Sequence, residues 1–142
     1  MKKALLYLTV ILLILNAAGA LFGGWHLMMH PDGSSMGMTV QVLEHSPFDS
    51  FLIPGILLFF FLGMFSLVVL GTIVFDHRQY PWLIMIQGGI ILGWILIQMI
   101  LLQTVVTLQV GFGAIGLLLV VCAWMLKELL VAQGSSLEDF MP

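Results

Sequence analysis

Charge is what this sequence lacks most. Of its 142 residues only four are Lys or Arg and seven are Asp or Glu, so 8% are charged whereas 61% are hydrophobic. An ordinary soluble domain has about 25% charged residues. A soluble fold of this length could not cover so much apolar surface, and the mean hydropathy of +1.17 agrees. The composition therefore predicts an integral membrane protein.

Cysteine is almost as scarce, since Cys122 is the single one and lies in an apolar stretch. That count excludes an intrachain disulfide and a Cys-x-x-Cys redox pair, so we interpret Cys122 as a packed small hydrophobic residue. Ionisable side chains are also missing from the apolar stretches, which argues against a proton relay or a voltage sensor acting alone. We expect a non-enzymatic protein without a cofactor.

The charge-free stretches predict four membrane-spanning helices, because about 20 helical residues cross the hydrocarbon core. Their approximate ranges are residues 4–24, 51–75, 82–103 and 110–131. The last two belong to one long uncharged run, which must fold back at its polar segment "LQTVVTLQVGFG". The predicted fold class is therefore an all-α, antiparallel bundle of four transmembrane helices, forming a single domain over residues 1–142.

The basic residues predict the orientation, since Lys and Arg are retained on the cytoplasmic side. A cytoplasmic N-terminus places all four of them inside, namely Lys2, Lys3, Arg78 and Lys127. Residues 25–50 then form an extracytoplasmic loop, and residues 132–142 form a cytoplasmic tail. "MKK" before an apolar run that ends in "AGA" also fits a cleaved secretory signal. We favour a retained helix because the apolar run continues through Phe22.

Within the outer loop, "SPFD" is typical of a helix start. We expect a short helix at residues 46–52, with Ser46 as its N-cap, and a bend at Pro54–Gly55 into the second span. The preceding "VQVLEHS" at residues 40–46 fits either a short helix or a strand.

Potential metal ligands gather in the stretch "GGWHLMMHPDGSSMGM". His26 and His30 are four residues apart, and His45 with a carboxylate of Asp32, Glu44 or Asp49 could complete a first-row metal site. Four methionines would suit Cu(I), namely Met28, Met29, Met36 and Met38. Pro31 disfavours a helical His30, so we prefer an ordinary helix end and turn. Metal handling is one alternative function, and an interfacial enzyme with His45, Asp49 or Glu44 as acid or base is another.

Small residues and amides in the spans predict helix contacts. The two GxxxG motifs, Gly19 with Gly23 and Gly89 with Gly93, allow close approach of helix backbones. Gln87 and Gln98 are about three turns apart on one face and are expected to bond to another helix. Packing within the bundle, a homo-oligomer or another membrane subunit, and a polar-lined cleft all remain open. The candidate binding residues are Trp25, Pro54, Gly55, Gln87 and Gln98.

The order "HPDGSSMGM", "LEHSPFDSFLIPGILLF" and a Gly-rich third helix resembles small four-helix bacterial inner-membrane proteins of unassigned function. The likeness covers most of the chain, and its most specific part is "SPFDSFLIPG". It implies a four-span fold in a bacterial cytoplasmic membrane and transfers no catalytic residue. We therefore expect an accessory or scaffold subunit, or a binder of lipid or another apolar partner, with no role in binding nucleic acid. Its predicted binding mouth lies at the loop and the Pro54–Gly55 bend, because pockets in bundles open at helix ends.

Overall fold

The computed structural model of the protein describes residues 1–134. Its helices in chain order are α1 (Lys2–Met29), two short 3₁₀ helices η1 (Ser34–Met36) and η2 (Val40–Leu43), α2 (Leu52–Leu57), the π-helical segment η3 (Leu58–Met64), α3 (Phe65–Val74), α4 (Tyr80–Leu102) and α5 (Thr107–Ala132). Segments α2, η3 and α3 follow one another without a break, as one helix Leu52–Val74. The described residues contain four helices long and apolar enough to cross a membrane, and no strand.

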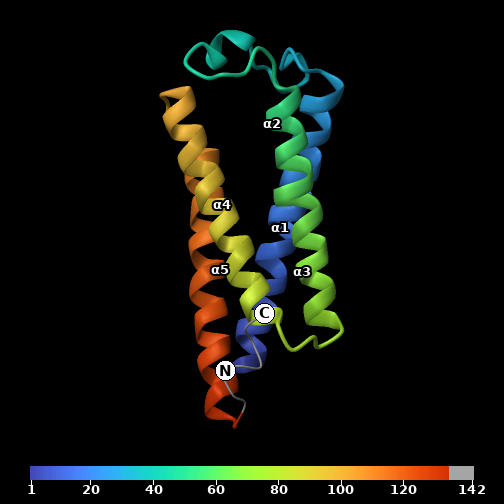
Figure 1. Ribbon diagram of the computed structural model, residues 1–142, viewed down its shortest axis with the longest axis vertical. Helices are drawn as coiled ribbons and strands as arrows, with labels where there is room; N and C mark the ends of the chain where they lie inside the picture. Colours follow the sequence, from blue (N-terminus) through green and yellow to red (C-terminus); the bar gives the residue numbers. More distant parts are fainter. Residues whose placement is uncertain (135–142) are drawn as a thin grey trace.

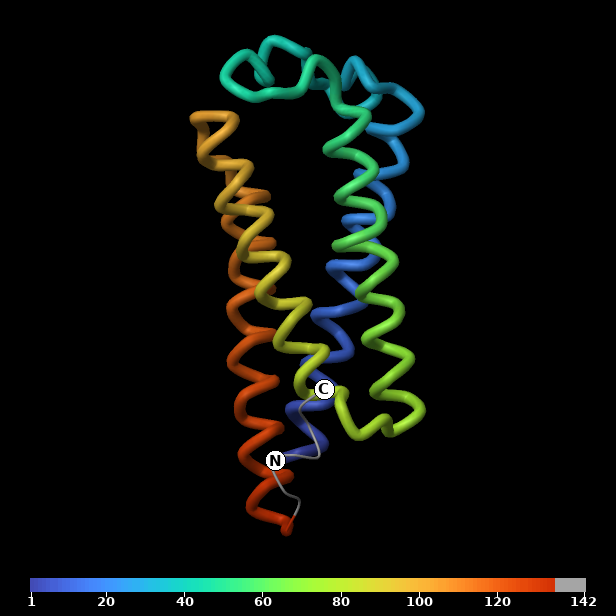
Figure 2. Tube along the Cα trace, viewed as in Figure 1, coloured from blue at the N-terminus to red at the C-terminus, as the bar shows by residue number. Residues whose placement is uncertain are grey.

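The four long helices lie side by side as two pairs (Figure 1). One pair is α1 with the α2–η3–α3 helix, and the other is α4 with α5. The loop of residues 30–51, which we call the cap, lies at the same end as the α4–α5 connection, whereas the start of α1 and the α3–α4 connection lie at the opposite end. Figure 2 shows that the two pairs meet near that opposite end and diverge toward the cap.

Small residues bring the helices of each pair into close contact. A Cβ atom built on Gly24 of α1 would lie 2.7 Å from the backbone nitrogen of Phe59 in η3. In the other pair, a Cβ on Gly88 of α4 would lie 2.8 Å from the carbonyl oxygen of Gly116 in α5. Only glycine permits such approaches, and they increase van der Waals contact where lipid supplies no hydrophobic drive for association.

A buried polar cluster joins the two pairs. Asn16 Nδ2 donates to the carbonyl oxygen of Leu62 (2.9 Å) and to Ser66 Oγ (2.8 Å). Gln87 Nε2 donates to the same two atoms, at 3.1 and 2.8 Å, and the Ser66 hydroxyl donates to the Leu62 carbonyl at 2.7 Å. Asn16, Ser66 and Gln87 are fully buried. The cluster therefore ties α1, the α2–η3–α3 helix and α4 together at one level of the bundle.

The cap differs from the prediction. Residues 46–51 are not helical, so the predicted helix at 46–52 is wrong. The Ser46 hydroxyl donates to the Leu43 carbonyl oxygen (2.8 Å) and accepts from the Phe48 amide (3.3 Å), which makes a local turn rather than a helix cap. The helix starts at Leu52, and Pro54 falls in its first turn, where a missing N–H costs nothing and no bend is required.

The other boundaries differ in smaller ways. Helix α1 continues to Met29, beyond the expected end at residue 24, and residues 40–43 form the 3₁₀ helix η2 rather than a strand. The α4–α5 connection is residues 103–106, inside the polar segment where a hairpin was expected. There the Val106 amide donates to Gln109 Oε1 at 3.1 Å, which caps the start of α5. Of the expected tail at 132–142, residues 135–142 lie outside the described residues.

Candidate functional site

An apolar cavity of about 470 Å³ lies between the two helix pairs, directly beneath the cap. Its volume falls in the range of about 300–1,000 Å³ that small-molecule sites occupy. Leu27 of α1 contributes to the walls, but most of their residues come from three other parts of the chain. They are the cap with Met38, Leu43, Phe48 and Phe51, the α2–η3 segment with Pro54, Leu58, Phe61 and Leu62, and α4 with Ile90, Gly93, Trp94, Ile97 and Gln98.

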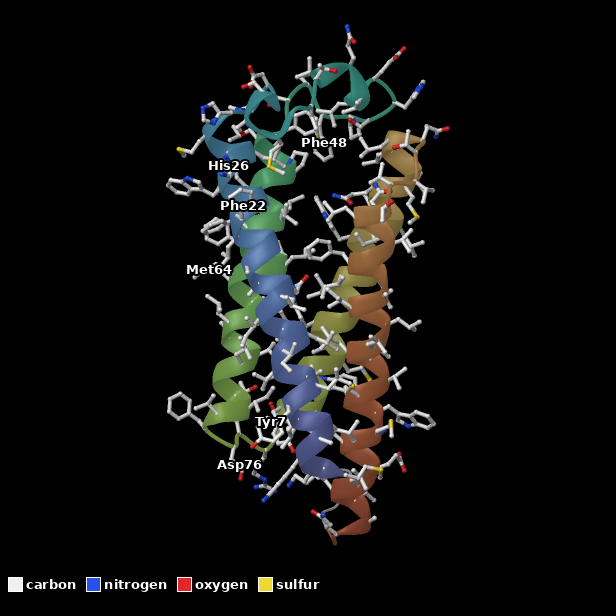
Figure 3. The ribbon with its side chains drawn as sticks, turned by 180° about the vertical axis from the view of Figure 1, so that it is seen from behind. Tyr7, Phe22, His26, Phe48, Met64 and Asp76 are labelled. Carbon is white, nitrogen blue, oxygen red and sulfur yellow. The ribbon has the colours of Figure 1, made fainter. Side chains whose placement is uncertain are left out.

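The cap is folded back over the cavity by local turns and by its own small core. The Phe51 amide donates to the Pro31 carbonyl oxygen at 2.8 Å, which brings the two ends of the cap together. Gly33 has a positive φ of 81°, and its carbonyl oxygen accepts from the Met38 amide at 2.9 Å. Phe51 and Leu43 are buried against Leu27 of α1. Phe48 lies beneath the cap on the inner side (Figure 3).

The side wall of the cavity is partly exposed. Phe61 of η3 and Ile97 of α4 both line it, and they are 56% and 50% exposed. Both residues belong to helices that are long and apolar enough to cross a membrane, so this exposed part of the wall lies along those helices and not at the cap.

The predicted binding residues separate into two groups. Pro54 and Gln98 line the cavity. Gly55 lies behind the wall, because a Cβ there would be 2.8 Å from Leu27 Cβ on α1. Gln87 is engaged in the polar cluster, and Trp25 is 53% exposed and does not line the cavity. Two of the five predicted residues therefore line the cavity, and the other three do not.

The predicted packing glycines also separate. Gly19 contacts the Phe112 ring of α5, and Gly23 lies near Leu58, where an added Cβ would be at 3.3 Å. At Gly89 and Gly93 an added Cβ would meet no atom of the described residues within 4 Å. The α4 motif is therefore not the contact that was expected, because the close approach is made one residue earlier, at Gly88. Gly93 instead lines the cavity.

The histidines of the predicted metal site do not converge. The His26 ring packs against the Phe22 ring, with centroids 4.4 Å apart, on the outer side of α1 (Figure 3). His30 leaves the helix with φ −129° and ψ 76°, as expected of a residue before Pro31, so the two rings do not share a helical face. Within residues 1–134 no three His, Cys, Asp or Glu side chains are grouped as a metal site would need.

The carboxylates of the cap lie away from the cavity as well. Asp32 accepts hydrogen bonds from the Ser34 amide (3.0 Å) and hydroxyl (2.8 Å), and these bonds lower the pKa of its carboxyl from the ordinary 3.8. Glu44, His45 and Asp49, the acid and base residues of the enzyme alternative, are exposed, and none of them lines the cavity. The geometry provides no support for either alternative function.

Sequence reasoning missed the most informative wall residues, Gly93 and Trp94 of α4. In a helix that is almost entirely apolar, the sequence does not show which residues face a cavity. The one available signal was Gln98, which follows Trp94 by four residues and therefore shares its face. Comparisons with protein-family models, with curated proteins and with solved structures find no match for this chain.

Proposed function

We propose that this protein binds a lipid-like apolar molecule in the cavity beneath its cap and acts as a non-enzymatic binding or accessory subunit. The observation that carries the proposal is the cavity itself, about 470 Å³ in volume, with apolar walls that are partly exposed at the side of the bundle, at Phe61 and Ile97. A methylene group is close in size to a liquid water molecule, at roughly 30 Å³. The cavity therefore has room for one hydrocarbon chain of about 15 carbons.

We further propose an antiparallel bundle in a bacterial cytoplasmic membrane, with both termini in the cytoplasm and the cap outside. Lys2, Arg78 and Lys127 lie in the segments at the end opposite the cap, which fits the retention of basic residues in the cytoplasm. The resemblance to small bacterial inner-membrane proteins supports the location. The cavity would then lie in the outer leaflet. Tags on either terminus that react from the periplasm in intact cells would refute this orientation.

Selectivity in such a site cannot come from the hydrophobic effect alone. A chain that moves from bilayer to cavity exchanges one hydrocarbon surrounding for another, so little transfer free energy is gained. Affinity must come from the fit of the chain to walls that are already formed and from any polar group placed among them. Phe61, Trp94 and Phe48 supply the large rigid surfaces that such a fit requires.

The test uses Trp94 as an internal reporter of the cavity. In a variant whose other tryptophans, Trp25, Trp82 and Trp124, are replaced by Phe, a dibrominated octadecane is titrated into the protein in non-brominated detergent. Saturable quenching of Trp94 fluorescence is expected, because bromine quenches an indole only on contact.

Two matched substitutions distinguish the cavity from the general surface. Gly93→Leu places a side chain in the cavity and Gly89→Leu places one on the lipid-exposed side of the same helix, and neither position has an atom within 4 Å of an added Cβ. We expect Gly93→Leu to abolish saturable quenching and Gly89→Leu to preserve it. Equal quenching in the parent and both variants would refute the cavity as a binding site.

A further inference from the structure

The cavity wall holds two unpaired polar side chains among the described residues, the Trp94 indole, whose buried Nε1 has no hydrogen-bond partner, and the Gln98 amide. The three other glutamines along α4 and the start of α5 each have a partner for their side-chain amide. Gln87 donates to Leu62 and Ser66, Gln103 Nε2 donates to the Ile100 carbonyl oxygen, and Gln109 Oε1 accepts from the Val106 amide. Gln98 makes no hydrogen bond to any described residue, and its amide is not sealed inside the protein. Both its donor and its acceptor are available to a molecule in the cavity.

An unpaired amide among apolar walls is costly unless a bound group satisfies it. Gln98 precedes the end of α4 at Leu102 by four residues, or about 6 Å along the helix axis. The wall on the deeper side of Gln98, at Ile90 and Leu62, is apolar. Gln98 therefore adds one free amide to an otherwise apolar wall, in the part of the cavity nearer the cap, which matches a molecule with one polar end and one chain.

The charged residues around the cap restrict which polar group the bound molecule can carry. No Lys or Arg occurs between Lys3 and Arg78 or between Gln79 and Leu126. The cap contributes the carboxylates of Asp32, Glu44 and Asp49. Its only side chains that can become cationic are the exposed histidines His30 and His45. A phosphate or sulfate bound at Gln98 would have no Lys or Arg of the cap, of the α2–η3–α3 helix or of α4 to pair with it. A neutral group meets no such penalty.

We propose that the cavity selects an uncharged single-chain lipid with a hydroxyl at its end, and that Gln98 is the specificity-determining residue. A primary amide donates to the hydroxyl oxygen and accepts from its proton, so one alcohol can satisfy both halves of the side chain. This inference rests on the proposed function, since it assigns a chemical class to the ligand of the same cavity.

The test compares three dibrominated octadecyl probes in the Trp94 quenching assay: the alcohol, the plain alkane and the alkyl sulfate. We expect the alcohol to bind about 3- to 10-fold more tightly than the alkane, the range that one hydrogen bond supplies. The sulfate is expected to bind more weakly than the alkane. The Gln98→Leu variant should bind the alcohol and the alkane equally, and unchanged alkane binding in this variant shows that its cavity is intact.

Gln41→Leu is the matched control, since Gln41 is exposed in η2 and does not line the cavity. It should retain the preference for the alcohol. A preference that survives Gln98→Leu, or a sulfate that binds as tightly as the alcohol, would overturn the inference while leaving the cavity as a binding site. If no probe quenches Trp94 saturably, the proposed function fails together with this inference.

Discussion

The sharpest structural prediction concerns two adjacent glycines of α4. Gly88→Ala is expected to destabilise the protein, whereas Gly89→Ala is not. A Cβ on Gly88 would lie 2.8 Å from the Gly116 carbonyl oxygen, 2.8 Å from Val120 Cγ2 and 3.0 Å from the Val120 backbone nitrogen. Two of these three atoms are backbone and cannot rotate away, so α4 and α5 must separate. A Cβ on Gly89 meets no atom of residues 1–134 within 4 Å.

The magnitude follows from two terms. Replacing a helical glycine by alanine favours the helix by about 0.8–1 kcal/mol at either position. Overpacking at Gly88 costs about 1–3 kcal/mol, because a well-packed contact must open to admit the methyl group. The helix term cancels when the two variants are compared. The free energy of unfolding of Gly88→Ala should therefore lie about 1–3 kcal/mol below that of Gly89→Ala.

The measurement is reversible unfolding by sodium dodecyl sulfate in mixed micelles, followed by circular dichroism, with the wild-type protein in parallel. Equal free energies for the two variants would refute the arrangement in which Gly88, and not Gly89, faces α5. A larger loss for Gly89→Ala would mean that the Gly89–Gly93 motif is the real contact, made either with α5 or with a second copy of the chain.

Three further outcomes are expected. Gln87→Leu should lower the free energy of unfolding by about 0.6–2 kcal/mol in the same assay, since it removes two buried hydrogen bonds but leaves the Asn16 bonds in place; no change would refute a stabilising role for the cluster. The Asp32 carboxyl should titrate below 3.8 by carbon-detected NMR, and Ser34→Ala should move its pKa only part of the way back, because the amide of residue 34 still donates. The lowered pKa means that this turn stabilises the cap above the ordinary carboxyl pKa and loses that contribution as the pH falls through the lowered value. Protein purified without a histidine tag should carry no stoichiometric copper or zinc, and a bound metal that is lost in the His26→Ala, His30→Ala double variant would contradict the separation of these two rings.

The four spans were predictable because charge is a strong signal in a membrane sequence. The hydrocarbon core excludes ions, so the ends of the uncharged runs mark the spans to within a few residues, except at the α4–α5 turn, which was located from its Gln and Thr residues. The exit of His30 from the helix was also predictable, since a proline restricts the residue before it. The end of α1 was placed too early because about 20 residues were expected to complete a span, whereas the helix continues to Met29 and packs its small residues Gly23 and Gly24 against Leu58 and Phe59.

The rotation of α4 about its axis could be predicted only in part from the sequence, which placed Gln87 against another helix. In a soluble helix the polar face identifies the solvent side, but α4 has only two amide side chains within it, Gln87 and Gln98, and provides little such contrast. Its buried face is fixed by Gln87 and Gly88, which bond to the Leu62 carbonyl and approach Gly116. The GxxxG spacing favoured Gly89 and Gly93 instead. The motif fixes only the separation of two glycines along the helix and does not show whether they face another helix, the cavity or the outside of the bundle.

The position of the cavity follows from where the helix pairs are held together. Glycines permit close contact within each pair, whereas the pairs are joined to each other by the polar cluster at Asn16 and Gln87, by the contact of Gly19 with Phe112 and by the shared apolar core. Above that level the facing residues include Phe61 and Trp94, which are too large for the pairs to close and leave space where Gly93 has no side chain. The cap spans the resulting gap and is anchored at Leu27 and Phe51. The two pairs could therefore approach one another only if the cap and the cluster both rearranged, so the cavity is already formed before any ligand enters.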